Sequence, residues 1–247
     1  MNLFCGFIAI KTALVDSNFV AAGWYIVLGA VFDMFDGMMA RLVKASSEFG
    51  VELDSLCDVV TFGVAPSAIL FKAYFFQYPG TGLLLAALPA ITGALRLARF
   101  NVQLVGFDKD YFRGLPIPSA AILIISYVTF HHLELPVGEQ LSDPWMFIVS
   151  IGASLLMVST VKYDTIPKPS PRNIKAHPLK FGIYFIGIIA AIWTKGSAIF
   201  PLFVIFVLYG VVRSAYERTA RLIRERKAAA LLDEEELERE EESTFGI

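Results

Sequence analysis

Apolar runs of about 20 residues recur along the whole chain and are separated by short charged loops. A helix of that length crosses the hydrocarbon layer of a bilayer, and a soluble chain of this size would not carry so many of them. The composition agrees, because 56% of the 247 residues are hydrophobic, 18% are charged and the mean hydropathy is +0.61. We therefore expect an all-α polytopic integral membrane protein.

The apolar runs predict about eight transmembrane helices, covering residues 2–15, 19–42, 50–76, 80–100, 114–130, 144–161, 178–193 and 198–212. The first run is short for a span, and we expect it to be a helix trimmed at its cytosolic end. Eight spans place both termini on one side. The loops on that side hold most of the basic residues, namely Arg41, Lys44, Arg96, Arg99, Lys109, Arg113, Lys162, Lys168, Arg172, Lys175 and Lys180. By the positive-inside rule this side is cytosolic.

Four aspartates lie at the end of the second run and the start of the third. Asp33 and Asp36 are i, i+3 neighbours, and Asp54 and Asp58 continue an i, i+4 stripe that begins at Gly50. Clustered carboxylates surrounded by apolar sequence cannot all stay ionised unless cations neutralise them. Ligation by acidic oxygens suits Mg²⁺ or Mn²⁺, with a substrate phosphate as a further ligand. The sequence therefore predicts a metal site that opens to the cytosol.

The spacing of these acids, D-x2-D-G-x2-A-R-x8-G-x3-D-x3-D over residues 33–58, is similar to the signature of the CDP-alcohol phosphotransferase family. The resemblance implies a six-helix catalytic core and a two-metal site with Asp33, Asp36, Asp54 and Asp58 as ligands. In the family that this sequence resembles, the residue matching Asp58 is the general base that takes the proton of the acceptor hydroxyl. Spacing alone does not rank the four acids.

The resemblance also implies a binding site for a CDP-activated lipid, formed by Asn2, Asp33, Gly37, Ala40, Arg41 and Gly50. Gly37 has no side chain, so either a nucleotide or a neighbouring helix can approach it closely. Arg41 suits a phosphate contact, and the alternative is that it extends to the membrane interface. Asn2 matches the asparagine that ends a Thr-x-x-Asn pattern in the family, although the threonine is absent here.

Three shorter patterns resemble the phosphatidylserine synthase branch of this family: ALRLARFNVQ, FRGLPIPSAA and MVSTVKY. That branch transfers the phosphatidyl group of CDP-diacylglycerol to L-serine and releases CMP. A serine acceptor brings a carboxylate, which a guanidinium binds bidentately. We therefore expect an acceptor pocket that includes Arg96, Arg99, Asn101 and Arg113; for Arg96 and Arg99, simple extension to the interface is the alternative.

Two other functions remain open at this point. A relative with a different acceptor, glycerol 3-phosphate or an inositol phosphate, would share the metal site but favour additional cations around the pocket. A divalent-cation transporter would place acids near the bilayer midplane with polar positions on both sides of them. Here the acids lie at one face and the outer halves of both helices are apolar, which favours the enzyme.

The sequence also predicts the domain limits, the location and the partners of the chain. We predict a transmembrane catalytic domain over residues 1–216 and a charged cytosolic tail over residues 217–247, basic next to the membrane and acidic beyond. The size and the absence of an organelle-targeting segment favour the inner membrane of a prokaryote. The resemblance implies a homodimer in contact with membrane lipids, and no nucleic-acid partner is expected.

Overall fold

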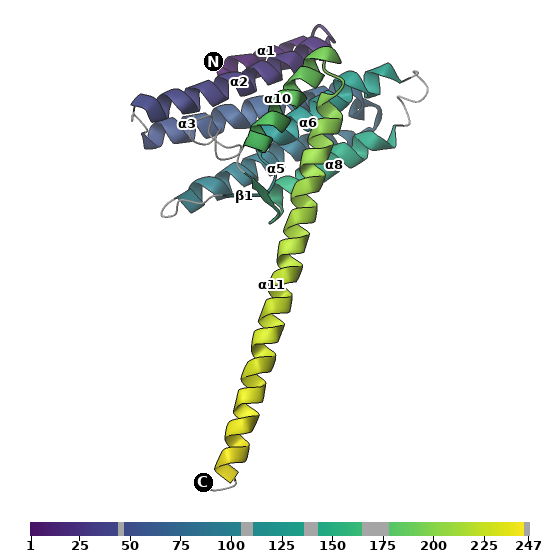
Figure 1. Ribbon diagram of the computed structural model, residues 1–247. Helices are drawn as coiled ribbons and strands as arrows, with labels where there is room; N and C mark the ends of the chain where they lie inside the picture. The colour runs from purple at the N-terminus through teal and green to yellow at the C-terminus, as the bar shows by residue number, and fades with distance from the viewer. Residues whose placement is uncertain (44–46, 105–110, 136–142, 165–177, 245–247) are drawn as a thin grey trace.

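The computed structural model describes residues 1–43, 47–104, 111–135, 143–164 and 178–244 (Figure 1). Helices account for nearly all of them. In chain order the elements are α1 (Asn2–Leu14), α2 (Phe19–Val43), α3 (Glu48–Asp58), the π-helix η1 (Val59–Val64), α4 (Ala65–Ala73), the 3-10 helix η2 (Phe75–Gln77), α5 (Thr81–Leu104), β1 (Tyr111–Arg113), α6 (Ile117–Phe130), the 3-10 helix η3 (His132–Glu134), α8 (Pro144–Val158), β2 (Lys162–Asp164), α10 (Pro178–Trp193) and α11 (Ile199–Thr244).

Each predicted apolar run contains a helix, and the third run contains α3, η1 and α4 joined end to end. Among the described residues, four helices are long and apolar enough to cross a membrane: Phe19–Met39, Phe49–Ala73, Thr81–Val102 and Ile199–Arg221. Two shorter apolar helices, Asn2–Leu14 and Pro144–Val158, pack beside them. The prediction of an all-α membrane protein is confirmed.

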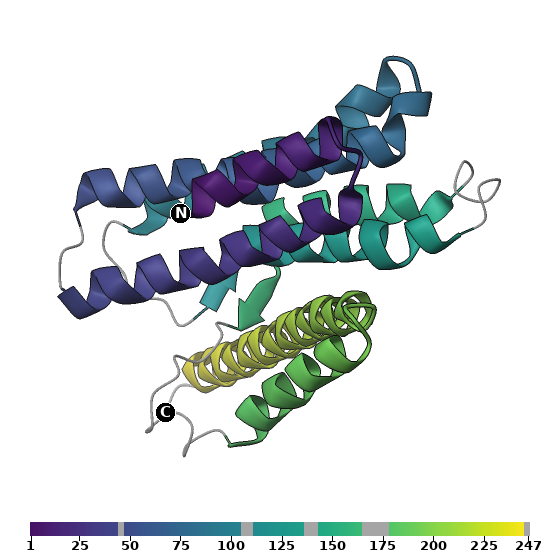
Figure 2. The same ribbon diagram turned by 90° about the horizontal axis from the view of Figure 1, so that it is seen from above.

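Six helical rods form the body of the molecule, namely α1, α2, the joined helices α3, η1 and α4, then α5, α6 and α8. α1 folds back on α2 and also packs against α4, while α5 packs against α4 and α8. α6 lies in the middle, in contact with α2, α4, α8 and α11, and most of its side chains are buried. Figure 2 shows α10 and the start of α11 lying together at one side of these six rods.

A small antiparallel sheet joins two connections on the same side of the bundle. β1 precedes α6, β2 follows α8, and Phe112 pairs with Tyr163 in the ladder. Tyr163 is buried, and its ring lies 5.6 Å from that of Phe206 on α11. The sheet therefore ties the segments expected at the acceptor pocket to the last helix.

α11 is one unbroken helix of 46 residues that extends well beyond the bundle (Figure 1). It passes through the expected domain boundary at residue 216 without interruption. Arg218 donates to the Thr160 hydroxyl at 3.2 Å, which holds this part of α11 against the end of α8.

A buried polar network closes the other end of the bundle. The Asp143 carboxylate accepts hydrogen bonds from the Tyr127 hydroxyl at 2.6 Å and from the Trp145 backbone N–H at 2.9 Å. The ring nitrogen Nδ1 of His132 lies 2.8 Å from the same carboxylate. The network joins α6, η3 and the start of α8, and side chains of His132 and Asp143 are nearly inaccessible to solvent. Asp143 thus satisfies polar groups from three elements at once.

Replacement of Asp143 by alanine should destabilise the protein, because the Tyr127 hydroxyl and the first turn of α8 would lose their acceptor while still buried. We expect the free energy of unfolding to fall by about 3 kcal/mol. Thermal unfolding in detergent measures the change. Asp16→Ala is the matched control, since Asp16 pairs with Lys11 at the exposed surface and should contribute well under about 1 kcal/mol. Equal unfolding temperatures for the two variants would contradict the role given to Asp143.

Candidate metal and substrate site

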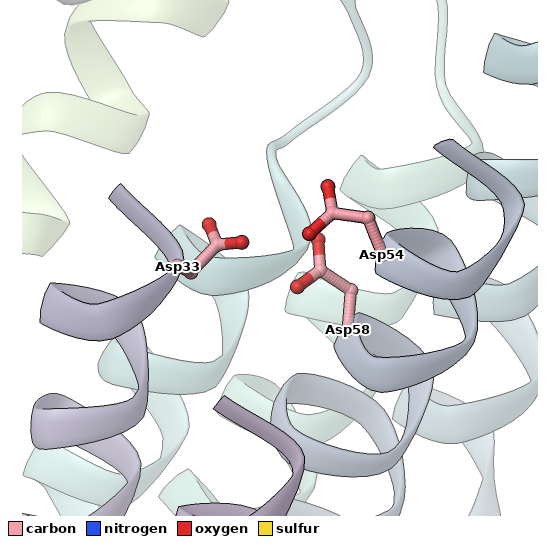
Figure 3. A group of neighbouring side chains, drawn as sticks. All are labelled: Asp33, Asp54 and Asp58. Carbon is pink, nitrogen blue, oxygen red and sulfur yellow. The ribbon is translucent and has the colours of Figure 1, made fainter. Parts of the chain in front are cut away.

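Three aspartate side chains, one from α2 and two from α3, point toward one another (Figure 3). Asp33 comes from the second half of α2, and Asp54 and Asp58 come from successive turns of α3. One carboxylate oxygen from each lies within 4.8 Å of those from the other two. The i, i+4 spacing predicted Asp54 and Asp58 on one face of α3; the fold brings Asp33 of α2 close to that face.

The fourth predicted acid, Asp36, lies at the rim of this group. It is one turn beyond Asp33 on α2, and its side chain is 58% exposed. It is close enough to Asp33 and Asp54 for the negative charges to repel one another. The structure therefore brings three acids within ligand distance and places the fourth beside them, toward solvent.

The three central acids differ in how far their side chains are buried. Asp58 is the deepest, at 9% exposed, whereas Asp33 is half-buried and Asp54 is exposed. The side-chain amide of Asn2 donates to Oδ1 of Asp58 at 2.8 Å, and the guanidinium of Arg96 on α5 interacts electrostatically with the same carboxylate. Asp58 is thus the acid that protein groups orient most closely.

The three carboxylates fit a divalent cation. They are hard oxygen donors within 4.8 Å of one another, at the point where α2 and α3 emerge from apolar surroundings. Mutual repulsion in such a place disfavours three free anions and favours a bound cation. Oxygen ligation of this kind suits Mg²⁺ or Mn²⁺ better than the thiophilic metals.

The residues expected to bind the nucleotide line the ends of the same two helices. Gly50 stands in the first turn of α3, one turn before Asp54, and its N–H donates to the Ser47 hydroxyl at 3.0 Å. That capping bond fixes where α3 begins. Gly37 follows Asp36 on α2; Ala40 and Arg41 are in the last turns of α2, and their side chains lie outside the described residues.

Asn2, expected at the nucleotide, is buried at 4% exposure and points its amide at Asp58. Its backbone carbonyl accepts a hydrogen bond from the Thr61 hydroxyl at 3.1 Å. Thr61 was not singled out from the sequence, because a threonine in an apolar run carries no pattern that predicts a contact with a residue 59 positions away.

The residues expected to bind the acceptor lie in different surroundings. Arg96 is buried near Asp58, while Arg99 is exposed and donates to the Val158 carbonyl at 3.0 Å, at the end of α8. Arg113 lies in β1 opposite Lys162, and its side chain is outside the described residues. Of the expected acceptor-site arginines whose side chains the structure describes, Arg96 is the one that lies next to Asp58.

Asn101 joins α5 to α3. Its amide donates to the Ser55 hydroxyl at 3.0 Å and lies 3.4 Å from a carboxylate oxygen of Glu52. Ser55 and Glu52 share one face of α3, next to the face that carries Asp54 and Asp58. Sequence reasoning missed both residues, although their i, i+3 spacing beside the acid stripe was a usable signal.

The chain is also similar to known proteins. Residues 1–158 match the family described as CDP-alcohol phosphatidyltransferase. The chain is 33% identical to the CDP-diacylglycerol–serine O-phosphatidyltransferase of Helicobacter pylori over 92% of its length and 93% of that relative. It is 36% identical to the Bacillus subtilis protein of the same name, over 71% of the chain and 92% of the relative. It is also 36% identical to the archaetidylserine synthase of Methanothermobacter thermautotrophicus, over 67% of each.

Replacing one acid by its amide should raise the stability of the metal-free protein and weaken metal binding. In Asp33→Asn one repelling charge is removed, so we expect a higher unfolding temperature than wild type in EDTA. The same change removes a ligand, so Mn²⁺ should raise the unfolding temperature less, with affinity at least about tenfold weaker. Thermal unfolding at a series of Mn²⁺ concentrations measures both effects. Asp16→Asn, at the opposite end of the bundle, should behave like wild type, and an unchanged Mn²⁺ response in Asp33→Asn would contradict the metal site.

Proposed function

Because the chain belongs to the CDP-alcohol phosphatidyltransferase family, we propose that it transfers the phosphatidyl group of CDP-diacylglycerol to the hydroxyl of L-serine and releases CMP. The observation that carries the proposal is the group of Asp33, Asp54 and Asp58 in a chain that is similar over most of its length to serine phosphatidyltransferases. The enzyme is an integral membrane protein. We place its site at the cytosolic face of a prokaryotic inner membrane, because the basic loops lie on the side of the acids.

Asp33, Asp36, Asp54 and Asp58 would hold two divalent cations, Mg²⁺ or Mn²⁺. Bound there, such ions neutralise a diphosphate and stabilise charge on the attacking and leaving oxygens. Asp33 and Asp54 point toward each other from α2 and α3 (Figure 3), so the diphosphate of the lipid would bind beside these two carboxylates. The glycines at positions 37 and 50 leave room beside the acids for the cytidine. Ala40 and Arg41 would contact the same nucleotide from the end of α2.

The acid–base step is assigned to Asp58. Its carboxylate accepts the proton of the serine hydroxyl while the serine oxygen forms a bond to the lipid-side phosphorus. The bond from that phosphorus to the oxygen of CMP breaks, and CMP leaves with the electron pair. The depth of Asp58 and its hydrogen bond from Asn2 support this role, because a base must be held in one orientation relative to the proton it takes.

The acceptor would bind between α3 and α5. Arg96 offers a guanidinium for the serine carboxylate, beside the proposed base. Asn101 and the nearby Glu52 offer a carbonyl and a carboxylate that suit the serine ammonium group. Arg99 and Arg113, from the same end of the bundle, would complete the positive surroundings of the pocket. Homodimerisation stays a prediction from the family resemblance.

Release of CMP from CDP-diacylglycerol by the purified protein tests the proposal, with Mn²⁺ or Mg²⁺ and with L-serine, glycerol 3-phosphate or inositol phosphate as acceptor. We expect release that requires L-serine and stops when EDTA removes the metal. Release with a phosphorylated acceptor alone would overturn the serine assignment but keep the family chemistry. No release with any acceptor would overturn the proposal and favour metal transport.

The same assay tests the base. Asp58→Asn keeps the size of the side chain but cannot take the proton, so turnover should fall by about 100-fold or more. Metal-dependent binding of CDP-diacylglycerol, measured in parallel, shows whether the site is still assembled. Near-normal turnover by Asp58→Asn with bound metal would overturn the assignment of the base.

A further inference from the structure

Thr61 lies one turn after Asp58, inside the π-helix η1, and is completely buried. Its hydroxyl donates to the backbone carbonyl of Asn2 at 3.1 Å. The side chain of Asn2 in turn donates to Asp58 at 2.8 Å. Asn2 is therefore held at two points by one helix, through its main chain at Thr61 and through its side chain at Asp58.

Two glycines fix Thr61 in this place. A Cβ atom on Gly6 of α1 would lie 2.8 Å from the Thr61 Cα, closer than packed atoms approach. A Cβ atom on Gly29 of α2 would lie 2.8 Å from the Thr61 methyl group and 3.2 Å from Oδ1 of Asn2. Thr61 thus fills the space between α1 and α2 with little freedom to move, and its hydroxyl can reach only a narrow range of positions.

The local winding of the helix supports a functional role. η1 begins at Val59, immediately after Asp58, and π-helical turns are rare and concentrate at functional sites. The wider turn changes the direction in which Thr61 points relative to Asp58, compared with the i, i+3 relation of an α-helix. Asp58 and Thr61 consequently contact the side chain and the main chain of the same residue on α1.

We propose that Thr61 is a positioning residue for the proposed reaction: it holds Asn2, and Asn2 orients the Asp58 carboxylate toward the acceptor hydroxyl. Thr61 does not contact substrate or metal in this arrangement. The inference rests on the proposed function, because it concerns how Asp58 is aligned for that chemistry. It predicts that loss of the Thr61 hydroxyl lowers turnover more than it lowers substrate binding.

The test replaces Thr61 by valine, which keeps the shape and removes the hydroxyl, and measures CMP release with the acceptor that the wild-type enzyme uses. We expect kcat to fall about 5- to 10-fold and KM for CDP-diacylglycerol to stay within about twofold. Thr61→Ser keeps the hydroxyl and should retain kcat within about twofold of wild type. Thr129→Val is the matched control, since the Thr129 hydroxyl on α6 is buried and makes no hydrogen bond within the described residues; its kcat should be unchanged.

A double-variant cycle shows whether Thr61 acts through Asn2. In the background of Asn2→Ala, the change Thr61→Val should lower kcat by less than about twofold further, because the link to Asp58 is already broken. Full additivity of the two effects would overturn the proposal. Loss of activity in a folded Thr61→Ser variant would also overturn the proposal. This second test remains usable if Thr61→Val is unstable. The wild-type enzyme is measured in the same experiment. If it releases CMP, the proposed function holds, and a result against Thr61 then overturns only the positioning role.

Discussion

Repulsion among carboxylates in apolar surroundings is the constraint on which the site depends. Carboxylate oxygens of Asp33, Asp54 and Asp58 lie within 4.8 Å of one another on two helices that are long and apolar enough to span a membrane. Without neutralising charge they would push α2 and α3 apart, since like charges at such distances are poorly screened outside bulk water. A divalent cation bound by these acids would reverse the sign of the interaction and link the two helices. Metal binding would therefore also influence how α2 and α3 lie relative to each other.

Close packing of α1 against its neighbours holds Asp58 from the other side. Ala9 and Ala13 on α1 and Ala22 on α2 are completely buried, and Gly6 and Gly29 leave no room for a Cβ atom. Small residues allow membrane helices to approach closely and to form hydrogen bonds between them. That approach places Asn2 against Asp58 and Thr61 against Asn2. α1 carries none of the three aspartates but contacts the deepest of them through Asn2.

The spacing of Asp54 and Asp58 predicted their shared face, and the apolar runs predicted every helix of the body. Those features follow from helical periodicity, which is local. The contact of Asn2 with Asp58 joins positions 56 residues apart, so no local pattern carries it. The π-helical turn after Asp58 and the network at Asp143 arise from tertiary packing in the same way. The exposed position of Asp36 also escaped prediction, because i, i+3 spacing on α2 fixes a helix face but not how far from solvent each residue lies.

The most direct test of the account is electron–nuclear double resonance spectroscopy of the Mn²⁺-loaded protein with CDP-diacylglycerol. We predict a hyperfine coupling between Mn²⁺ and the phosphorus nuclei of the diphosphate, of the size given by direct coordination. At the same Mn²⁺ concentration the coupled signal should be weaker in Asp33→Asn, which lacks one ligand and binds Mn²⁺ less tightly, and unchanged in Asp16→Asn. A Mn²⁺ signal without phosphorus coupling in the wild-type complex would show that the acids do not bring metal and diphosphate together, and would contradict the account.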